Sequence, residues 1–188
     1  MDEAGHGSSW TSGPQEAGGD GVCGIDPGLD GALVTVSAGG IVACHDMPTL
    51  RLGSKRRVDP AGVADILAGV THAVVERVHS MPKQGVASSF SFGESYGILL
   101  GVLAGLCIPY SLVTPQRWKK EMMEGQQREK DASRMVARQR WPLSAVLFKR
   151  KKDHGRADAA LIAEWGRRRL ARPIPPDFFE GCEAGDEA

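Results

Sequence analysis

Three short apolar runs near the start of the chain are separated by glycine-rich turns. The runs are Val22–Asp26, Ala32–Ser37 and Ile41–Asp46, and the turns between them are Pro27–Gly31 and Ala38–Gly40. Short turns of this kind join consecutive strands that pair with one another in antiparallel fashion. The pattern therefore predicts a three-stranded β-meander at the start of the folded domain.

Helices and strands alternate after the meander. Asp59-Pro60 combines a side chain favoured at the N-cap with proline at the first helical position, so we expect a helix from there to about Ala68. The later segments predict, in order, a strand, a buried helix, a strand and three further helices: Ala73–Val78, Ser88–Leu106, Pro109–Val113, a helix starting at Thr114-Pro115, Lys130–Arg140 and Arg156–Leu170. A meander followed by this alternation indicates an α/β domain with a mixed sheet.

Charge is distributed unevenly along the 188 residues. Lys+Arg and Asp+Glu both total 23, yet residues 1–22 and 177–188 contain acidic side chains and no Lys or Arg. The residues between them therefore carry a net charge of about +9, which is compatible with a polyanionic partner and also with ordinary solvated helix faces. We expect a disordered acidic, Gly/Ser-rich tail at 1–21, one domain at 22–172 and an acidic tail at 173–188.

Composition argues against several protein classes. A hydrophobic content of 41% is ordinary for a globular domain and excludes wholesale disorder. The chain contains no apolar run near the ~18 residues of a membrane span and no signal-peptide pattern. Its four cysteines are widely spaced and form no C-x-x-C pair, which argues against a zinc ribbon or a disulfide framework.

Three acidic residues occupy positions where an unpaired carboxylate is costly. Asp26 ends the first predicted strand, Glu76 shares a strand face with apolar residues, and Asp158 lies beside the buried stripe of the last helix. A buried carboxylate needs hydrogen bonds, an ion pair or a bound cation. Instead of binding a cation, Asp26 could accept hydrogen bonds from the Pro-Gly turn that follows it, and Glu76 could form a salt bridge.

A histidine precedes the third of these acids by one helical turn. His154 and Asp158 are four residues apart, so on a helix both side chains project from the same face, while Asp153 is expected to be the helix N-cap. A lone histidine at such a position is commonly an ordinary surface residue. Three acids and a histidine would suit one or two hard divalent ions if the fold brings them together.

The segments that carry these residues resemble the RuvC-type Holliday-junction resolvases. The resemblance rests on Gly24-Ile25-Asp26-Pro27-Gly28-Leu29-Asp30-Gly31, on Val75–Pro82 with Gln84-Gly85, and on Asp153–Ala159. Two further segments, Phe90–Gly97 and Thr114–Lys120, look closest to the chloroplast branch of that family and to related bacterial and phage enzymes. The resemblance covers about residues 22–171 and implies an RNase H-like fold, with a mixed five-stranded sheet flanked by helices.

The family implies a metal-dependent DNA endonuclease that resolves four-way junctions by paired symmetric nicks. Asp26, Glu76 and Asp158 match its metal-binding acids, and His154 is the fourth expected site residue. Many members have Asp or His three residues before the last acid, where this chain has Gly155, so the role of His154 stays open between metal ligand and acid–base group. Mg²⁺ is the expected cofactor, with Mn²⁺ able to substitute and two ions per site.

The resemblance also implies four-way junction DNA and a homodimer as partners, and neither a nucleotide cofactor nor a membrane. Basic residues are expected to contact phosphates: Arg117, Lys119, Lys120, Lys149, Arg150, Lys151, Lys152 and Arg156. In the loop His79–Ser89, we expect Met81, Lys83 and Gln84 to reach the junction. The helix Phe90–Leu106 is expected at the dimer interface, with ordinary core packing as the alternative. The location is the plastid nucleoid if the chloroplast resemblance holds, with the transit peptide absent from this chain, and otherwise the bacterial cytoplasm.

Three other functions compete with this interpretation. The pattern Asp26-x-Gly28-x-x-Gly31 also resembles the phosphate loop of actin-like ATPases, but those proteins need a second domain for which 188 residues leave no room. A nuclease that acts on other branched DNA or on RNA–DNA hybrids would share the fold. A catalytically inactive junction-binding module would be expected to lose the acids, and all three are present.

Overall fold

The computed structural model describes residues 21–77, 85–123 and 131–171. The elements follow one another in this order: β1 (Val22–Asp26), β2 (Ala32–Ser37), β3 (Gly40–Asp46), β4 (Thr49–Leu52), β5 (Lys55–Val58), α1 (Pro60–Leu67), β6 (His72–Glu76), α2 (Val86–Gly105), β7 (Tyr110–Val113), α3 (Pro115–Met122), α4 (Ala132–Arg140), the 3₁₀ segments η2 (Pro142–Phe148) and η3 (Lys151–Asp153), and α5 (His154–Leu170).

A five-stranded mixed sheet forms the centre of the domain, with strand order β3-β2-β1-β6-β7. The first three strands pair antiparallel, as the predicted meander requires, whereas β6 pairs parallel to β1 and β7 parallel to β6. The sequence-based prediction of a mixed five-stranded sheet is confirmed.

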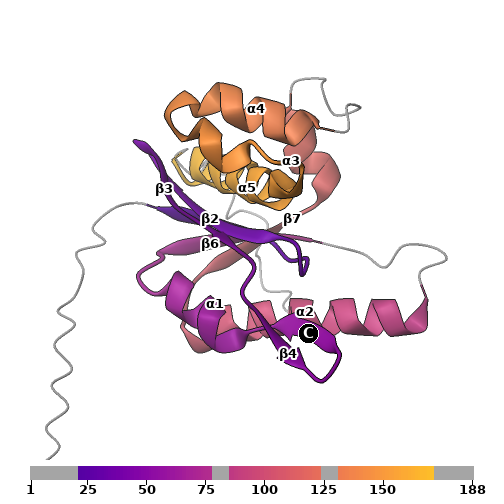
Figure 1. Ribbon diagram of the computed structural model, residues 1–188. Coiled ribbons are helices and arrows are strands. Elements are labelled where there is room, and N and C mark those ends of the chain that lie inside the picture. Colours follow the sequence, from indigo (N-terminus) through magenta and orange to yellow (C-terminus); the bar gives the residue numbers. More distant parts are fainter. Residues whose placement is uncertain (1–20, 78–84, 124–130, 172–188) are drawn as a thin grey trace, which may run out of the picture.

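Helices cover both faces of this sheet (Figure 1). One face packs on α1 and α2, where Cys23, Ile25 and Val75 meet Leu67 and Leu99 in one buried cluster. The other face packs on α5 and α3, and α4 lies outside them, packed on α5. Because side chains alternate along a strand, the residues of β1 that face α5 are Val22, Gly24 and Asp26.

The helix α5 lies unusually close to the sheet. A β-carbon added to Gly24 would lie 2.4 Å from the Ala163 backbone nitrogen, and one added to Gly166 would lie 2.3 Å from the Val74 side chain. Only a glycine on the strand and small residues on the helix allow this approach. The packing fixes the helix over β1, with its first turns beside the carboxyl end of that strand.

Several local predictions are confirmed and others need correction. Asp59 is the N-cap of α1, and its carboxylate accepts a hydrogen bond from the Ala61 backbone at 3.1 Å. The helix α5 begins at His154 rather than at Arg156. The two-stranded β4–β5 sheet and the 3₁₀ segment η2 were not predicted.

The expected tails at 1–21 and 173–188 lie outside the described residues, except for Gly21, so the domain boundaries stay predictions. None of the helices in the described part of the chain is long and apolar enough to cross a membrane.

Candidate active site

Asp26 and Glu76 lie side by side at one edge of the sheet. The parallel strands β1 and β6 pair Gly24 with Val74 and Ile25 with Val75, so the next residue of each strand is one of the two acids. Asp26 ends β1 and Glu76 ends β6. The carboxyl ends of adjacent parallel strands meet at the same edge, where α/β proteins place their functional groups.

Asp158 joins this pair from the first turns of α5. The pKa of Asp26 is raised to about 7, first by burial and then by the neighbouring carboxylates of Asp158 and Glu76. The Gly28 backbone nitrogen donates only a long hydrogen bond, 3.5 Å, to Asp26 Oδ1. The turn therefore stabilises the Asp26 carboxylate weakly, and the three acids lie within electrostatic reach of one another.

Glu76 is buried and hydrogen-bonded to an aromatic side chain. The Trp118 indole nitrogen donates to Glu76 Oε1 at 2.8 Å. Burial raises the pKa of Glu76, the indole hydrogen bond lowers it, and the Asp158 carboxylate raises it. Trp118 was not identified as a site residue from the sequence. The one signal that could have identified it was the presence of a tryptophan within a basic helix.

Lys119 faces all three acids. Its ammonium group lowers the pKa of Asp26, Glu76 and Asp158 by Coulomb attraction. The sequence assigned Lys119 to DNA phosphates, and the structure places its charge within electrostatic reach of the three carboxylates. A cation that reaches these acids is also positioned to meet a phosphate held beside them.

The Asp158 carboxylate is only partly satisfied. Burial raises its pKa, while a hydrogen bond from Ser133 and the charges of Lys119 and His154 lower it. Its Oδ1 is buried and has no hydrogen-bond partner within the described residues. A buried carboxylate oxygen without a donor is costly unless a cation binds it, so this atom fits the donor set of a metal ion. Ser133 carried no signal in the sequence that would have identified it.

His154 is exposed at the start of α5. Its charge reaches Asp158, as the four-residue spacing predicted, and its side chain also lines a polar pocket of about 510 Å³ together with Asp30, Asp46 and Lys152. At the next position, a β-carbon on Gly155 would lie 2.6 Å from the Asp30 carbonyl oxygen. The close packing of α5 against the β1–β2 turn thus excludes a carboxylate at residue 155. In this turn of the helix, His154 is the residue whose side chain lies near Asp158.

The acids are near one another but do not form a closed ligand shell. Across residues 21–77, 85–123 and 131–171, no three His, Cys, Asp or Glu side chains are gathered closely enough to hold a metal ion. Like-charged carboxylates repel when no cation lies between them. Asp26, Glu76 and Asp158 nonetheless fit a divalent ion by donor chemistry, because carboxylate oxygens are the ligands that such ions prefer and Asp158 Oδ1 has no other partner within the described residues.

Two of the basic residues assigned to DNA are engaged within the protein. Arg150 pairs with the buried Asp153, and Arg156 donates to both Asp46 oxygens, at 2.7 Å to Oδ2. Asp153 occupies the predicted N-cap position of α5, but it accepts hydrogen bonds from Arg150 rather than from the helix. The pKa of Asp46 is accordingly lowered, first by its hydrogen bond to Arg156.

The other predicted DNA-binding residues divide into two groups. Six lie within the described residues, and all of them are exposed except the half-buried Lys119: Arg117, Lys119, Lys120, Lys149, Lys151 and Lys152. Arg117 stacks on Trp165, 5.5 Å from its ring centroid. Met81, Lys83 and Gln84 lie outside the described residues.

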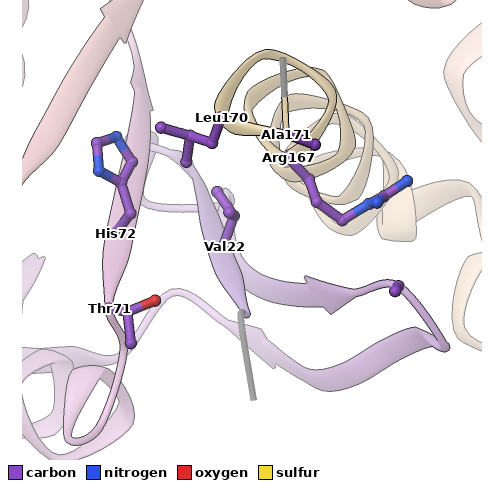
Figure 2. Close-up of a pocket in the computed structure, with 7 residues that line it drawn as sticks. Val22, Thr71, His72, Arg167, Leu170 and Ala171 are labelled. Atoms are coloured by element: carbon purple, nitrogen blue, oxygen red, sulfur yellow. The ribbon is translucent and has the colours of Figure 1, made fainter. Parts of the chain in front are cut away.

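A second pocket lies at the opposite end of β1. It measures about 440 Å³ and is lined by Val22, His72, Arg167 and Leu170 among others (Figure 2). Val22 begins the strand that Asp26 ends, so this pocket and the acids are separated by the length of β1. It contains none of the predicted site residues.

No family model matches the chain. The Holliday junction resolvase MOC1, chloroplastic, of Chlamydomonas reinhardtii is 34% identical over 94 residues, which is 50% of this chain and 11% of that protein. The chain thus spans about a ninth of the length of that relative.

A solved structure shows the same architecture. T. thermophilus RuvC in complex with a Holliday junction substrate aligns with a TM-score of 0.53 and 18% identity, over 82% of this chain and 99% of that one. A second structure of Thermus thermophilus RuvC has a TM-score of 0.49 at the same identity and coverage. The resemblance predicted from the sequence is confirmed: the protein has the RNase H-like fold of RuvC and is similar in sequence to a chloroplast Holliday junction resolvase.

Proposed function

We propose that the protein is a metal-dependent endonuclease that resolves four-way DNA junctions by paired symmetric nicks. The observation that carries this proposal is the meeting of Asp26, Glu76 and Asp158 at one edge of a RuvC-type sheet. Similarity over half the chain to a chloroplast Holliday junction resolvase supports the choice of substrate. A crossover junction endodeoxyribonuclease is the activity that this combination supports best.

Mg²⁺ is the proposed cofactor, with Mn²⁺ able to substitute and two ions per site. The resemblance to RuvC-type resolvases gives Asp26 the role of a ligand shared by both ions, and Glu76 and Asp158 would each hold one. Bound divalent ions would supply charge stabilisation at the phosphate and a water of lowered pKa. The partner-free Asp158 Oδ1 and the raised pKa of Asp26 support a cation at this position.

Two further side chains would act on the phosphodiester. Lys119, which faces all three acids, would attract the scissile phosphate toward them. His154 is exposed beside Asp158 and would exchange a proton at the 3′ oxygen that leaves when the P–O bond breaks. The alternative role of His154 is that of a metal ligand, and the two roles are separated by experiment below.

Phosphate contacts are proposed for the exposed lysines that flank the site. Lys149, Lys151 and Lys152 precede α5 directly, and Lys120 lies next to Lys119 on α3. Each such contact contributes affinity that falls with salt concentration. Met81, Lys83 and Gln84, which follow the Glu76 strand, are proposed to reach the junction itself.

A homodimer would supply the two active sites that paired nicks require. The helix α2 exposes Gly93, Gly97, Gly101 and Gly105 at four-residue intervals, and a β-carbon at any of them would meet nothing within 4 Å. Phe90 on the same helix is 74% exposed. A helix face made of glycines, with an exposed aromatic side chain at one end, supports close approach by a second copy of α2.

The proposed location is the plastid nucleoid, supported by the chloroplast relative. A bacterial cytoplasm is the alternative for a chain of this fold. Neither a nucleotide cofactor nor a membrane partner is part of the proposal.

The decisive experiment uses a synthetic four-way junction with each strand labelled in turn. The purified protein should introduce symmetric nicks in two opposing strands with Mg²⁺ or Mn²⁺, and none with EDTA. A linear duplex of the same sequence and an RNA–DNA hybrid serve as controls. Cleavage of the hybrid with an intact junction would indicate an RNase H, and junction binding with no cleavage in either metal would indicate an inactive binding module.

A further inference from the structure

The indole of Trp118 lies between two charged groups of the candidate active site. Its edge donates a hydrogen bond to Glu76 Oε1 at 2.8 Å, and the Lys119 ammonium lies over its ring, 5.1 Å from the centroid. Trp118 is fully buried, and Glu76 is 9% exposed. Water therefore competes little with the hydrogen bond, and the indole contacts one acid and one base of the same site.

The surrounding core holds this indole in place. Trp118 belongs to the buried cluster that also contains Val74 of β6, Val113 of β7 and Leu161 of α5. Val74 lies two residues before Glu76 on the same strand face, and Val113 pairs directly with Glu76 across the sheet. The ring thus packs against β6, which carries Glu76, and against β7 and α5. This packing holds the indole N–H in a fixed position that points at Glu76 Oε1.

We propose that Trp118 is a positioning residue for the metal site, an inference that rests on the proposed function. A glutamate side chain has several rotamers, and a carboxylate can present either oxygen to an ion. The indole holds Oε1, so the other oxygen, Oε2, is left to bind the ion. Ordering the ligand before the ion arrives reduces the entropy lost on binding, as other outer-sphere hydrogen bonds to ligands do.

The test removes the N–H group and keeps an aromatic ring at residue 118. Trp118 is replaced by 3-benzothienylalanine, in which sulfur takes the place of the indole N–H, and separately by phenylalanine. The probe is Mn²⁺ alone, titrated without DNA and followed by the electron paramagnetic resonance signal of the free ion. We expect the midpoint of binding to rise about 10–100-fold in both variants. Junction affinity in EDTA should stay at the wild-type value, because a buried ring contacts no DNA.

Two controls separate positioning from general damage to the core. Trp165→Phe removes another buried indole from the same cluster, one flanked by Arg117 and Arg169, and should leave the Mn²⁺ midpoint unchanged. In a Glu76→Ala background, the benzothienyl replacement should cause no further loss, because the partner of the hydrogen bond is absent.

The outcomes distinguish this inference from the proposed function. Wild-type Mn²⁺ binding by the benzothienyl variant, or an equal loss in Trp165→Phe, would overturn the role of Trp118. A wild-type protein that binds no Mn²⁺ would overturn both. A wild-type protein that binds Mn²⁺ in a Trp118-dependent manner, but cuts no junction, would overturn the nuclease function and support the positioning role.

Discussion

A β-carbon added to Gly24 would lie 2.0 Å from the carbonyl oxygen of Ala159, the residue that follows Asp158. The backbones of β1 and α5 therefore touch at a point two residues before Asp26 and one residue after Asp158. The distance between these two acids is set by a contact in which neither takes part. The geometry of the site depends on the absence of a side chain at residue 24.

The first prediction concerns Gly24→Ala. The added methyl group would meet backbone atoms of Ala159 and Ala163, which cannot move aside as a flexible side chain would. We expect the free energy of unfolding to fall by about 1–3 kcal/mol, measured by chemical denaturation. Junction cleavage should fall further than the folded fraction, because α5 must shift away from β1 and carry Asp158 with it.

Gly39→Ala is the matched control for this substitution. Gly39 is exposed in the β2–β3 turn, and the nearest atom to an added β-carbon is Ser37 Oγ at 3.7 Å. Stability should change by no more than about 0.5 kcal/mol, and cleavage should be unaffected. Equal effects of the two substitutions would contradict the importance of the Gly24 contact.

The second prediction concerns the pH dependence of stability in EDTA. The pKa of Asp26 is about 7 in the folded protein and about 4 in an unfolded chain. A carboxyl group with a raised folded pKa binds its proton more tightly when folded, so its stabilising contribution is present below pH ~4 and is lost as the pH rises to about 7. Asp26→Asn removes this titration, and its free energy of unfolding should exceed that of the wild type above pH 7.

The same substitution has a second expected effect. Asp26→Asn should abolish cleavage in Mg²⁺ and Mn²⁺ and leave junction binding intact, since an amide cannot replace the charge of the central acid. Asp65→Asn is a suitable control, because Asp65 is exposed on α1, which packs on the opposite face of the sheet from α5. Intact cleavage by Asp26→Asn, or loss of binding, would contradict the role of Asp26 as a metal ligand.

The sequence predicted the meander, the mixed sheet and the three acids because each depends on local patterns. Asp26 and Glu76 end apolar strands, and Asp158 lies beside an apolar helix stripe, all of which can be read along the chain. The contact between Trp118 and Glu76 joins residues 42 positions apart and depends on how α3 packs on the sheet. The β4–β5 hairpin was missed because most of its strand residues are exposed and half of them are basic, so they show little apolar alternation.

The third prediction concerns the salt dependence of junction binding. Lys152 is exposed beside α5, whereas Arg156 is committed to Asp46 through two hydrogen bonds. Lys152→Ala should reduce the slope of log affinity against log salt concentration by about 0.9, the value for one lost phosphate contact on duplex DNA. Arg156→Ala should leave that slope unchanged and lower the stability instead.

Fluorescence anisotropy in EDTA, at several salt concentrations, measures both slopes without cleavage. The double variant Asp46→Asn, Arg156→Ala checks that the stability loss comes from the ion pair, since removing Asp46 first should reduce the effect of removing Arg156. A reduced slope for Arg156→Ala would show that Arg156 leaves Asp46 for a phosphate when DNA binds.

The fourth prediction concerns His154, whose two candidate roles respond differently to the metal. His154 is exposed and lies near Asp158, and we expect it to exchange a proton at the leaving 3′ oxygen. His154→Ala should then slow single-turnover cleavage by about 10²–10⁴-fold, and by the same factor in Mg²⁺ and in Mn²⁺. An imidazole ligand would give a different result, because nitrogen ligands favour Mn²⁺ over Mg²⁺ and their loss should weaken Mn²⁺-supported cleavage more. The Mn²⁺ binding midpoint of His154→Ala provides the independent measurement: an unchanged midpoint with slow cleavage identifies the proton-transfer role, and a raised midpoint identifies a ligand.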